Sequence, residues 1–115
     1  MFFGNPMDKI EKLAQKGKSD KLVKYVGSKD KNVSLAAIRA LGSCDDETSF
    51  NTLTGLIIAE DPDVRIAALE GLGKIGKSAS FTHISNYVNR ESDPRVKKAM
   101  QDALSAISAK TKHGA

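Results

Sequence analysis

The residues of this chain that could carry chemistry begin with a glycine-rich run. Gly71–Ser78 reads Gly-Leu-Gly-Lys-Ile-Gly-Lys-Ser, which matches the phosphate-binding pattern G-x-x-x-x-G-K-[ST] and contains the dinucleotide pattern G-x-G-x-x-G. Either pattern binds phosphate where a β-strand leads into it and a helix follows, so that the helix N-terminus meets the phosphate. The elements that flank the run therefore decide its function.

Other reactive side chains are few. Cys44 is the single cysteine, so it forms no internal disulfide and is either a reactive thiol or a core residue. His83 has no cysteine, histidine or glutamate at metal-ligand spacing, and His113 lies near the end of the chain. The adjacent carboxylates Asp45–Glu47 do not form a cation cage, and we expect them to place negative charge near a helix N-terminus. We predict no catalytic residue, no metal site and no cofactor.

Lysines form the strongest functional signal. Residues 1–31 carry eight lysines against four acids, whereas residues 32–61 carry one arginine against five acids. The lysines that define the basic segment are Lys9, Lys12, Lys16, Lys18, Lys21 and Lys24. Such a patch could bind nucleic acid or an acidic partner, or be an ordinary solvated face. No aromatic residue interleaves with these lysines, which argues against single-stranded nucleic acid.

The elements that position these residues repeat along the chain. Val33, Val64 and Val96 are 31 and 32 residues apart, and each begins an apolar stripe at i, i+3, i+4, i+7, i+8 and i+11. That spacing is one face of an α-helix. The stripes are Val33-Ala36-Ala37-Ala40-Leu41-Cys44, Val64-Ala67-Ala68-Gly71-Leu72-Ile75 and Val96-Ala99-Met100-Ala103-Leu104-Ile107. We term these the A helices, and the small residues in the stripes predict close packing between them.

The starts of the predicted helices are marked by local sequence signals. Asp30, Asp61 and Asp93 are good N-cap residues, and a proline follows the last two at the first helical position. A second set of helices, the B helices, has its own aligned stripes. These are Ser19-Leu22-Tyr25-Val26, Phe50-Leu53-Leu56-Ile57 and Phe81-Ile84-Tyr87-Val88, with caps predicted at Thr48 or Ser49 and at Ser78 or Ser80. A further A helix is predicted over Met7–Lys16.

Together these segments predict an all-α chain of about seven helices in one domain, residues 1–115. The predicted units are repeats at 6–28, 29–60 and 61–91, an unpaired final helix at 93–109 and a frayed tail at 110–115. Each helix pair is too small to bury its apolar face alone, so the pairs must stack. No apolar run is long enough to span a bilayer and no secretory signal is evident, so we expect a cytoplasmic protein.

The run from Asp61 to Gly76, Asp-Pro-Asp-Val-Arg-Ile-Ala-Ala-Leu-Glu-Gly-Leu-Gly-Lys-Ile-Gly, resembles the HEAT repeat. It is most similar to the short repeats of phycobilin-lyase-type proteins and of many bacterial and archaeal scaffolds. The resemblance implies an α-solenoid of antiparallel helix pairs that mostly binds other proteins. It also implies ionic links between adjacent repeats through Asp63 with Arg65 and through Arg95 or Lys97, with Ser34 replacing the basic residue in the earlier repeat.

Their positions in the repeat predict structural roles for the glycine-rich run and for Cys44. The segment before Gly71–Ser78 carries a helical stripe where the phosphate-binding motif needs a strand, and Gly73 and Gly76 fall where an A helix is expected to end. Cys44 aligns with Ile75 and Ile107 at the end of the stripe, which predicts a buried thiol.

The predicted function is a non-catalytic scaffold or adaptor that binds a protein through the concave face of the B helices. The residues predicted to contact the partner are Lys21, Lys24, Thr52, His83 and Asn86. Two alternatives stay open: nucleic-acid binding by the basic N-terminal helices, and an accessory or chaperone role for a lyase-like enzyme. The final helix and Phe2-Phe3 either cap the stack or join it to a second copy.

Overall fold

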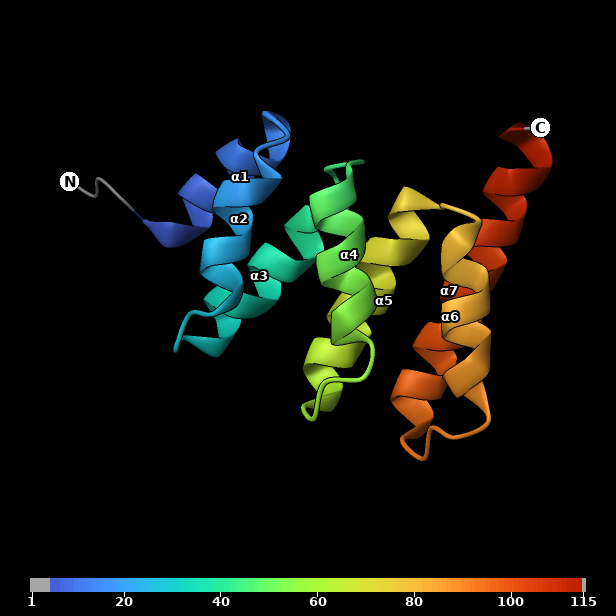
Figure 1. Ribbon diagram of the computed structural model, residues 1–115. Coiled ribbons are helices and arrows are strands. Elements are labelled where there is room, and N and C mark those ends of the chain that lie inside the picture. The colour runs from blue at the N-terminus through green and yellow to red at the C-terminus, as the bar shows by residue number, and fades with distance from the viewer. Residues whose placement is uncertain (1–4, 115) are drawn as a thin grey trace.

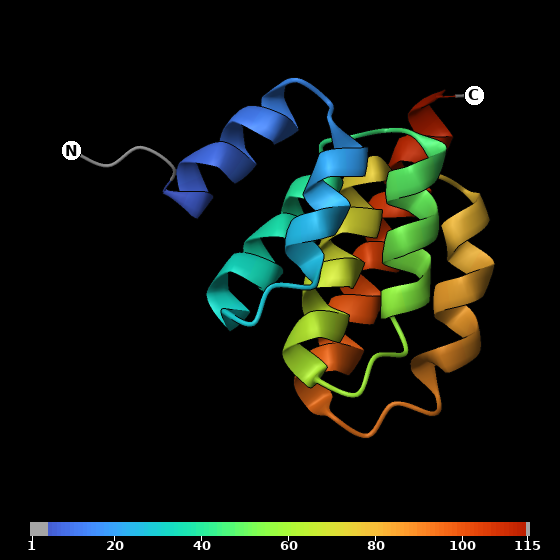
Figure 2. The same ribbon diagram turned by 60° about the vertical axis from the view of Figure 1, so that its left-hand side comes forward.

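The computed structural model describes residues 5–114, which form seven helices. In chain order these are α1 (Pro6–Gln15), α2 (Ser19–Val26), α3 (Lys31–Leu41), α4 (Glu47–Leu56), α5 (Pro62–Ile75), α6 (Ala79–Val88) and α7 (Pro94–Gly114). The A helices α1, α3, α5 and α7 form one layer, and the B helices α2, α4 and α6 form the other (Figures 1 and 2). The predicted all-α solenoid is confirmed. The described residues include no helix long and apolar enough to cross a membrane.

Aspartates begin the A helices, as predicted. The Asp30 side chain accepts hydrogen bonds from the amides of Asn32 and Val33, and Asp61 and Asp93 each accept one from the amide two residues on. Each carboxylate satisfies amide groups that have no partner within the helix. The three caps are 31 and 32 residues apart, the same spacings as Val33, Val64 and Val96.

The predicted cap of α4 is wrong. Asp46 caps this helix, accepting from the Ser49 amide at 2.8 Å, while the Ser49 hydroxyl contacts the Asp46 backbone to complete a capping box. Thr48 lies inside the helix. Ser78 does precede α6, but its side chain makes no capping hydrogen bond, and Ser80 is buried.

The predicted stripes form most of the core between the two layers, but Phe81, predicted in the α6 stripe, is 40% exposed. Val33, Leu41, Leu72, Met100 and Ile107 are all buried, and the B helices contribute residues such as Leu22, Leu53 and Ile84. Two large core residues lie outside the predicted stripes, Ile38 and Leu69, which are 31 residues apart. The corresponding position in α7 is Gln101, which is exposed. This position is therefore apolar in α3 and α5, each of which is followed by another A helix, and polar in α7, the last A helix that the structure describes.

Glycines allow neighbouring A helices to touch. A Cβ atom on Gly42 would lie 2.8 Å from the Gly71 Cα, and one on Gly73 would lie 3.4 Å from the Ala103 Cα. Gly42 and Gly73 are equivalent positions, but the approach is tight only at Gly42, since a Cβ on Gly73 would make an ordinary van der Waals contact. Gly73 was expected to end an A helix, but it lies inside α5 and admits α7 to its surface. Gly76 ends α5 with a φ of 70°, as predicted.

The predicted frayed tail is helical as far as Gly114. Helix α7 begins at Pro94 and continues through Lys110, whose ammonium donates to the Ile75 carbonyl oxygen at 2.6 Å. The aliphatic part of the Lys110 side chain also covers Gly76. This contact satisfies a carbonyl at the end of α5 and extends the last helix along it. Phe2 and Phe3 lie outside the described residues.

A basic groove beside the exposed B-helix face

The residues predicted to bind a partner lie on the B helices. Lys21 and Lys24 are on α2, Thr52 is on α4, and His83 and Asn86 are on α6. Thr52 is half-buried and the other four side chains are exposed. Helices α2, α4 and α6 run side by side across one face of the molecule (Figure 1). None of the five side chains makes a hydrogen bond or ion pair with another described residue.

The structure separates these five residues into two groups. Lys21 and Lys24 turn towards α1 and line a groove of about 350 Å³. We call this the basic groove; its lining residues are Lys9, Lys12, Leu13, Lys16, Lys21, Lys24 and Tyr25. Thr52, His83 and Asn86 lie outside it on the neighbouring helices. The predicted site residues on α4 and α6 are therefore polar without a lysine or arginine, whereas those on α2 are both lysines.

The local sequence explains how five lysines meet. Lys9 and Lys12 on α1 and Lys16 at its C-cap are spaced i, i+3 and i+7, which places them on one side of the helix. Gly17 then reverses the chain with a φ of 67°, so that α2 runs back beside α1. Lys21 and Lys24 are spaced i and i+3 on α2 and face the first three.

The floor of the groove is apolar. Leu13 and Tyr25 are half-buried against the core, and both also line the groove. The sequence predicted that no aromatic residue accompanies the lysines, and this prediction is wrong for Tyr25. Its place in the α2 stripe indicated a core role, and a tyrosine often has a buried body and an accessible edge. The adjacent Lys24 was the one available signal that Tyr25 also belongs to the groove.

The groove lysines have no counter-ions within the part of the chain that the structure describes. None of the five has a carboxylate oxygen within 4.0 Å of its ammonium. Five basic residues elsewhere form ion pairs, namely Lys31, Arg39, Arg65, Arg95 and Lys98, whereas others such as Lys29 and Lys97 form none with the described residues. Like charges held together raise the local potential and attract an anion.

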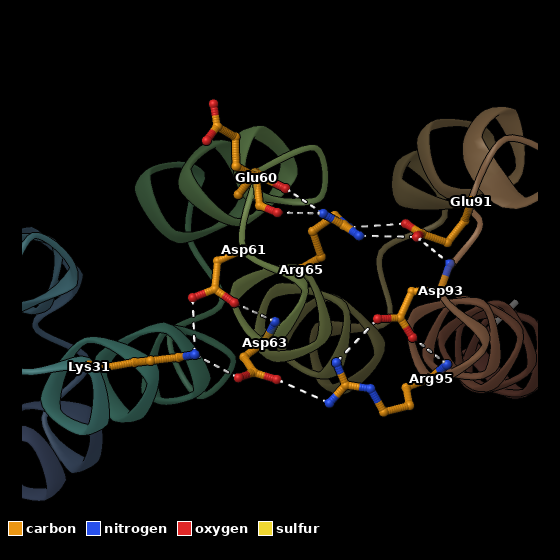
Figure 3. A network of polar contacts seen from close by, with 9 residues as sticks. Lys31, Glu60, Asp61, Asp63, Arg65, Glu91, Asp93 and Arg95 are labelled. Carbon is orange, nitrogen blue, oxygen red and sulfur yellow. Dashed lines mark hydrogen bonds and ion pairs between the residues drawn. The ribbon is translucent and has the colours of Figure 1, made fainter.

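The ion pairs on the A side link successive repeats, as Figure 3 shows. Asp63 on α5 accepts from Lys31 of α3 at 2.7 Å and from Arg95 of α7 at 3.3 Å. The hydrogen bond from Lys31 lowers the pKa of the Asp63 carboxyl, and the one from Arg95 adds to that effect. The predicted link through Asp63 and Arg95 is confirmed, whereas Lys97 forms no ion pair with the described residues.

Arg65 has a more buried role. Its guanidinium donates two hydrogen bonds to Glu91, both at 3.0 Å, and its side chain is 16% exposed. It also donates to the carbonyl oxygens of Ala59 and Glu60, just beyond the end of α4 (Figure 3). Ser34 occupies the equivalent position in the earlier repeat and donates to a B-helix carbonyl in the same way, at 2.6 Å. Ser34 therefore replaces the carbonyl contact of Arg65 and not its ion pair.

The structure gives no chemical role to the remaining reactive residues that it describes. Cys44 is 2% exposed, as predicted, and burial raises the pKa of its thiol. Gly71 and Gly73 are packed inside α5, so the phosphate-binding pattern does not form a loop. No group of three potential metal ligands occurs among the described residues. The side chain of His113 lies outside those residues.

Comparison with known proteins gives one match. A family model described as HEAT repeats matches residues 19–105, which run from the start of α2 into α7. No curated protein and no solved structure matches the chain significantly. The match concerns HEAT repeats in general and does not extend to the phycobilin-lyase-type variety.

Proposed function

Because the chain belongs to the HEAT-repeat family, we propose that it is a non-catalytic scaffold that binds a protein partner across the B-helix face. HEAT repeats generally mediate protein–protein interaction. In solenoids of stacked repeats the extended surface along the stack is the binding surface. The exposed residues of α2, α4 and α6 supply such a surface in this chain.

The observation that carries this proposal is the contrast between the two layers. Several charged residues on α3, α5 and α7 form ion pairs that join one repeat to the next, such as Lys31 with Asp63 and Arg39 with Glu70. The exposed side chains Lys24, His83 and Asn86 on the B helices form no such contacts. Their polar groups are therefore available to a partner without breaking any interaction of the fold.

Affinity capture from native lysate, with quantitative mass spectrometry, tests the proposal. The test variant carries Lys24→Glu with Asn86→Glu, on α2 and α6. The control carries Lys97→Glu with Gln101→Glu, two exposed positions on α7. Both variants change the net charge by the same amount, and circular dichroism confirms that each is folded.

We expect the recovery of specific partners to fall for the B-helix variant and to match the unmodified protein for the α7 variant. Equal recovery from all three proteins would remove the B-helix face as the binding surface. Loss with the α7 variant alone would move the interaction to the A side.

The basic groove favours a second candidate function, nucleic-acid binding. Five unpaired lysines and Tyr25 could contact a phosphate backbone and a base. Binding of this kind releases counter-ions, so affinity for a labelled DNA duplex would fall steeply as salt is raised. An absence of binding at about 50 mM salt would eliminate this candidate.

A further inference from the structure

We propose that the partner presents a short acidic segment with an apolar side chain near its centre, and that this segment docks in the basic groove. The inference rests on the proposed scaffold function and specifies the chemistry of its partner. It is carried by the charge of the groove walls, the apolar character of its floor and the surfaces that surround it.

The walls and floor specify the occupant. Five ammonium groups surround the half-buried side chains of Leu13 and Tyr25, and no acidic residue lines the groove. Carboxylates on a partner would neutralise the walls, and an apolar side chain would cover the floor. A groove of about 350 Å³ is at the small end of the range of ligand sites. It therefore accommodates a few residues of an extended or helical segment.

The surroundings favour a protein segment over nucleic acid. Helices α4 and α6 contain no lysine or arginine. Among the described residues, only Lys77 over Phe50 and Arg90 over Tyr87 bring a cation onto their aromatic rings, so the B helices beyond α2 carry no lysine cluster like that of the groove. At the start of α2, the Ser19 hydroxyl donates to the Asp46 carboxylate at 2.7 Å, which places an acidic loop beside the groove. The exposed acids Asp45 and Glu47 flank Asp46. A polyphosphate chain leaving the groove towards α4 would meet like charge, whereas a short acidic segment ends before it.

The type of basic residue supports the same conclusion. Every basic group in the groove is a lysine, and three of the four arginines, Arg39, Arg65 and Arg95, form ion pairs elsewhere. Arginine matches the geometry of phosphate with a planar pair of donors, while lysine acts as a mobile point charge. Flexible ammonium groups suit carboxylates whose positions vary along a peptide.

Fluorescence anisotropy with a defined peptide tests the proposal on the full chain. The probe is fluorescein-labelled Ser-Glu-Asp-Glu-Leu-Glu-Asp-Glu-Ser at low salt. A second peptide replaces its leucine by serine and keeps the charge. The groove variant is Lys12→Glu with Lys21→Glu, and the matched variant is Lys29→Glu with Lys97→Glu. Lys29 and Lys97 are exposed, form no ion pair with the described residues and lie outside the groove lining.

We expect saturable binding that weakens by at least about ten-fold in the groove variant and by much less in the matched variant. The serine peptide should bind more weakly than the leucine peptide, since it leaves the apolar floor uncovered. Equal affinity of the two variants would overturn the groove as the site. Equal affinity of the two peptides would overturn the apolar requirement.

Competition separates the two macromolecular classes. A twelve-nucleotide single strand and a duplex are added to the peptide complex. Displacement at concentrations below those of unlabelled peptide would overturn the choice of a protein segment and support nucleic acid. If the peptide fails to bind while partner capture still depends on Lys24 and Asn86, the groove proposal falls and the scaffold function stands. If capture is also insensitive to these residues, both fall.

Discussion

The close backbone contact between Gly42 and Gly71 predicts that Gly42→Ala destabilises the protein although alanine is the better helix residue. The new Cβ would lie 2.8 Å from the Gly71 Cα and 3.1 Å from the Gly71 carbonyl oxygen. Both atoms belong to the backbone of α5, so they cannot rotate away. Helices α3 and α5 must separate by a few tenths of an ångström, which weakens the packing around the buried Ile38.

The two opposing effects can be compared. Overpacking of this kind costs about 1–3 kcal/mol. Replacing glycine by alanine at a compatible φ stabilises by about 0.4–1 kcal/mol, because the unfolded chain loses freedom. The φ of Gly42 is −64°, so alanine meets no backbone strain there. The net expectation is a loss of about 1–2 kcal/mol, or roughly 4–8 °C in Tm for a chain of this size.

Urea and thermal denaturation followed by circular dichroism measure this loss, with Gly55→Ala as the matched control. Gly55 lies near the end of α4, and a Cβ there meets nothing within 4 Å. We expect this control to gain up to about 1 kcal/mol from helix propensity. A Gly42→Ala variant as stable as the parent would refute the close crossing of α3 and α5.

Three further predictions concern the ionic links and the thiol. Arg65→Ala should lower the free energy of unfolding by about 2–3 kcal/mol, because it leaves the carboxylate of Glu91, which is 8% exposed, without its ion pair. Arg39→Ala removes a half-exposed ion pair and should lower it by less than about 1 kcal/mol. Similar losses for the two variants in urea denaturation would contradict this ranking. The pKa of Asp63 is lowered in the folded state by its hydrogen-bonded lysine, so its contribution is present above about pH 4 and is lost as acid protonates it. Asp63→Asn should therefore narrow the stability difference between pH 7 and pH 3, and an unchanged pH profile would argue against the link. Cys44 should react with a thiol reagent at the rate of unfolding in water and rapidly in urea; fast reaction of the native protein would show that the thiol is accessible.

The repeat made most of the fold predictable. A period of 31 residues placed Val33 and Val64 on equivalent helices and predicted that Cys44 is buried. The same period identified Asp30 and Asp61 as caps before any contact was known. These features follow from local spacing and capping chemistry, which each repeat expresses independently of its neighbours.

The errors arose where contacts between distant segments decide the outcome. Gly73 and Gly76 give the same local signal of a helix end, but Gly73 lies inside α5 beside α7 and the helix ends at Gly76, where φ is 70°. The tail has a polar composition typical of fraying, yet Lys110 reaches back 35 residues to Ile75. No local pattern contains that contact.

The candidate site was predictable in part for the same reason. Lys21 and Lys24 were assigned to the concave face of the B helices from the repeat alone. Their convergence with the lysines of α1 depends on how α1 packs beside α2. Among the A helices, α1 follows the repeat least closely in sequence. The role of Tyr25 in the groove floor could not be predicted, because its spacing in the α2 stripe is that of a core residue. Tyr25 does also pack against the core.

The most direct test of the account is to map the bound surface by nuclear magnetic resonance. Amide spectra of the isotope-labelled chain would be recorded during titration with the acidic leucine peptide. The account predicts that saturable shift changes concentrate between Lys9 and Tyr25, with the amides of Lys97 and Gln101 unaffected. Changes centred on α5 and α7, or spread evenly over the chain, would contradict it.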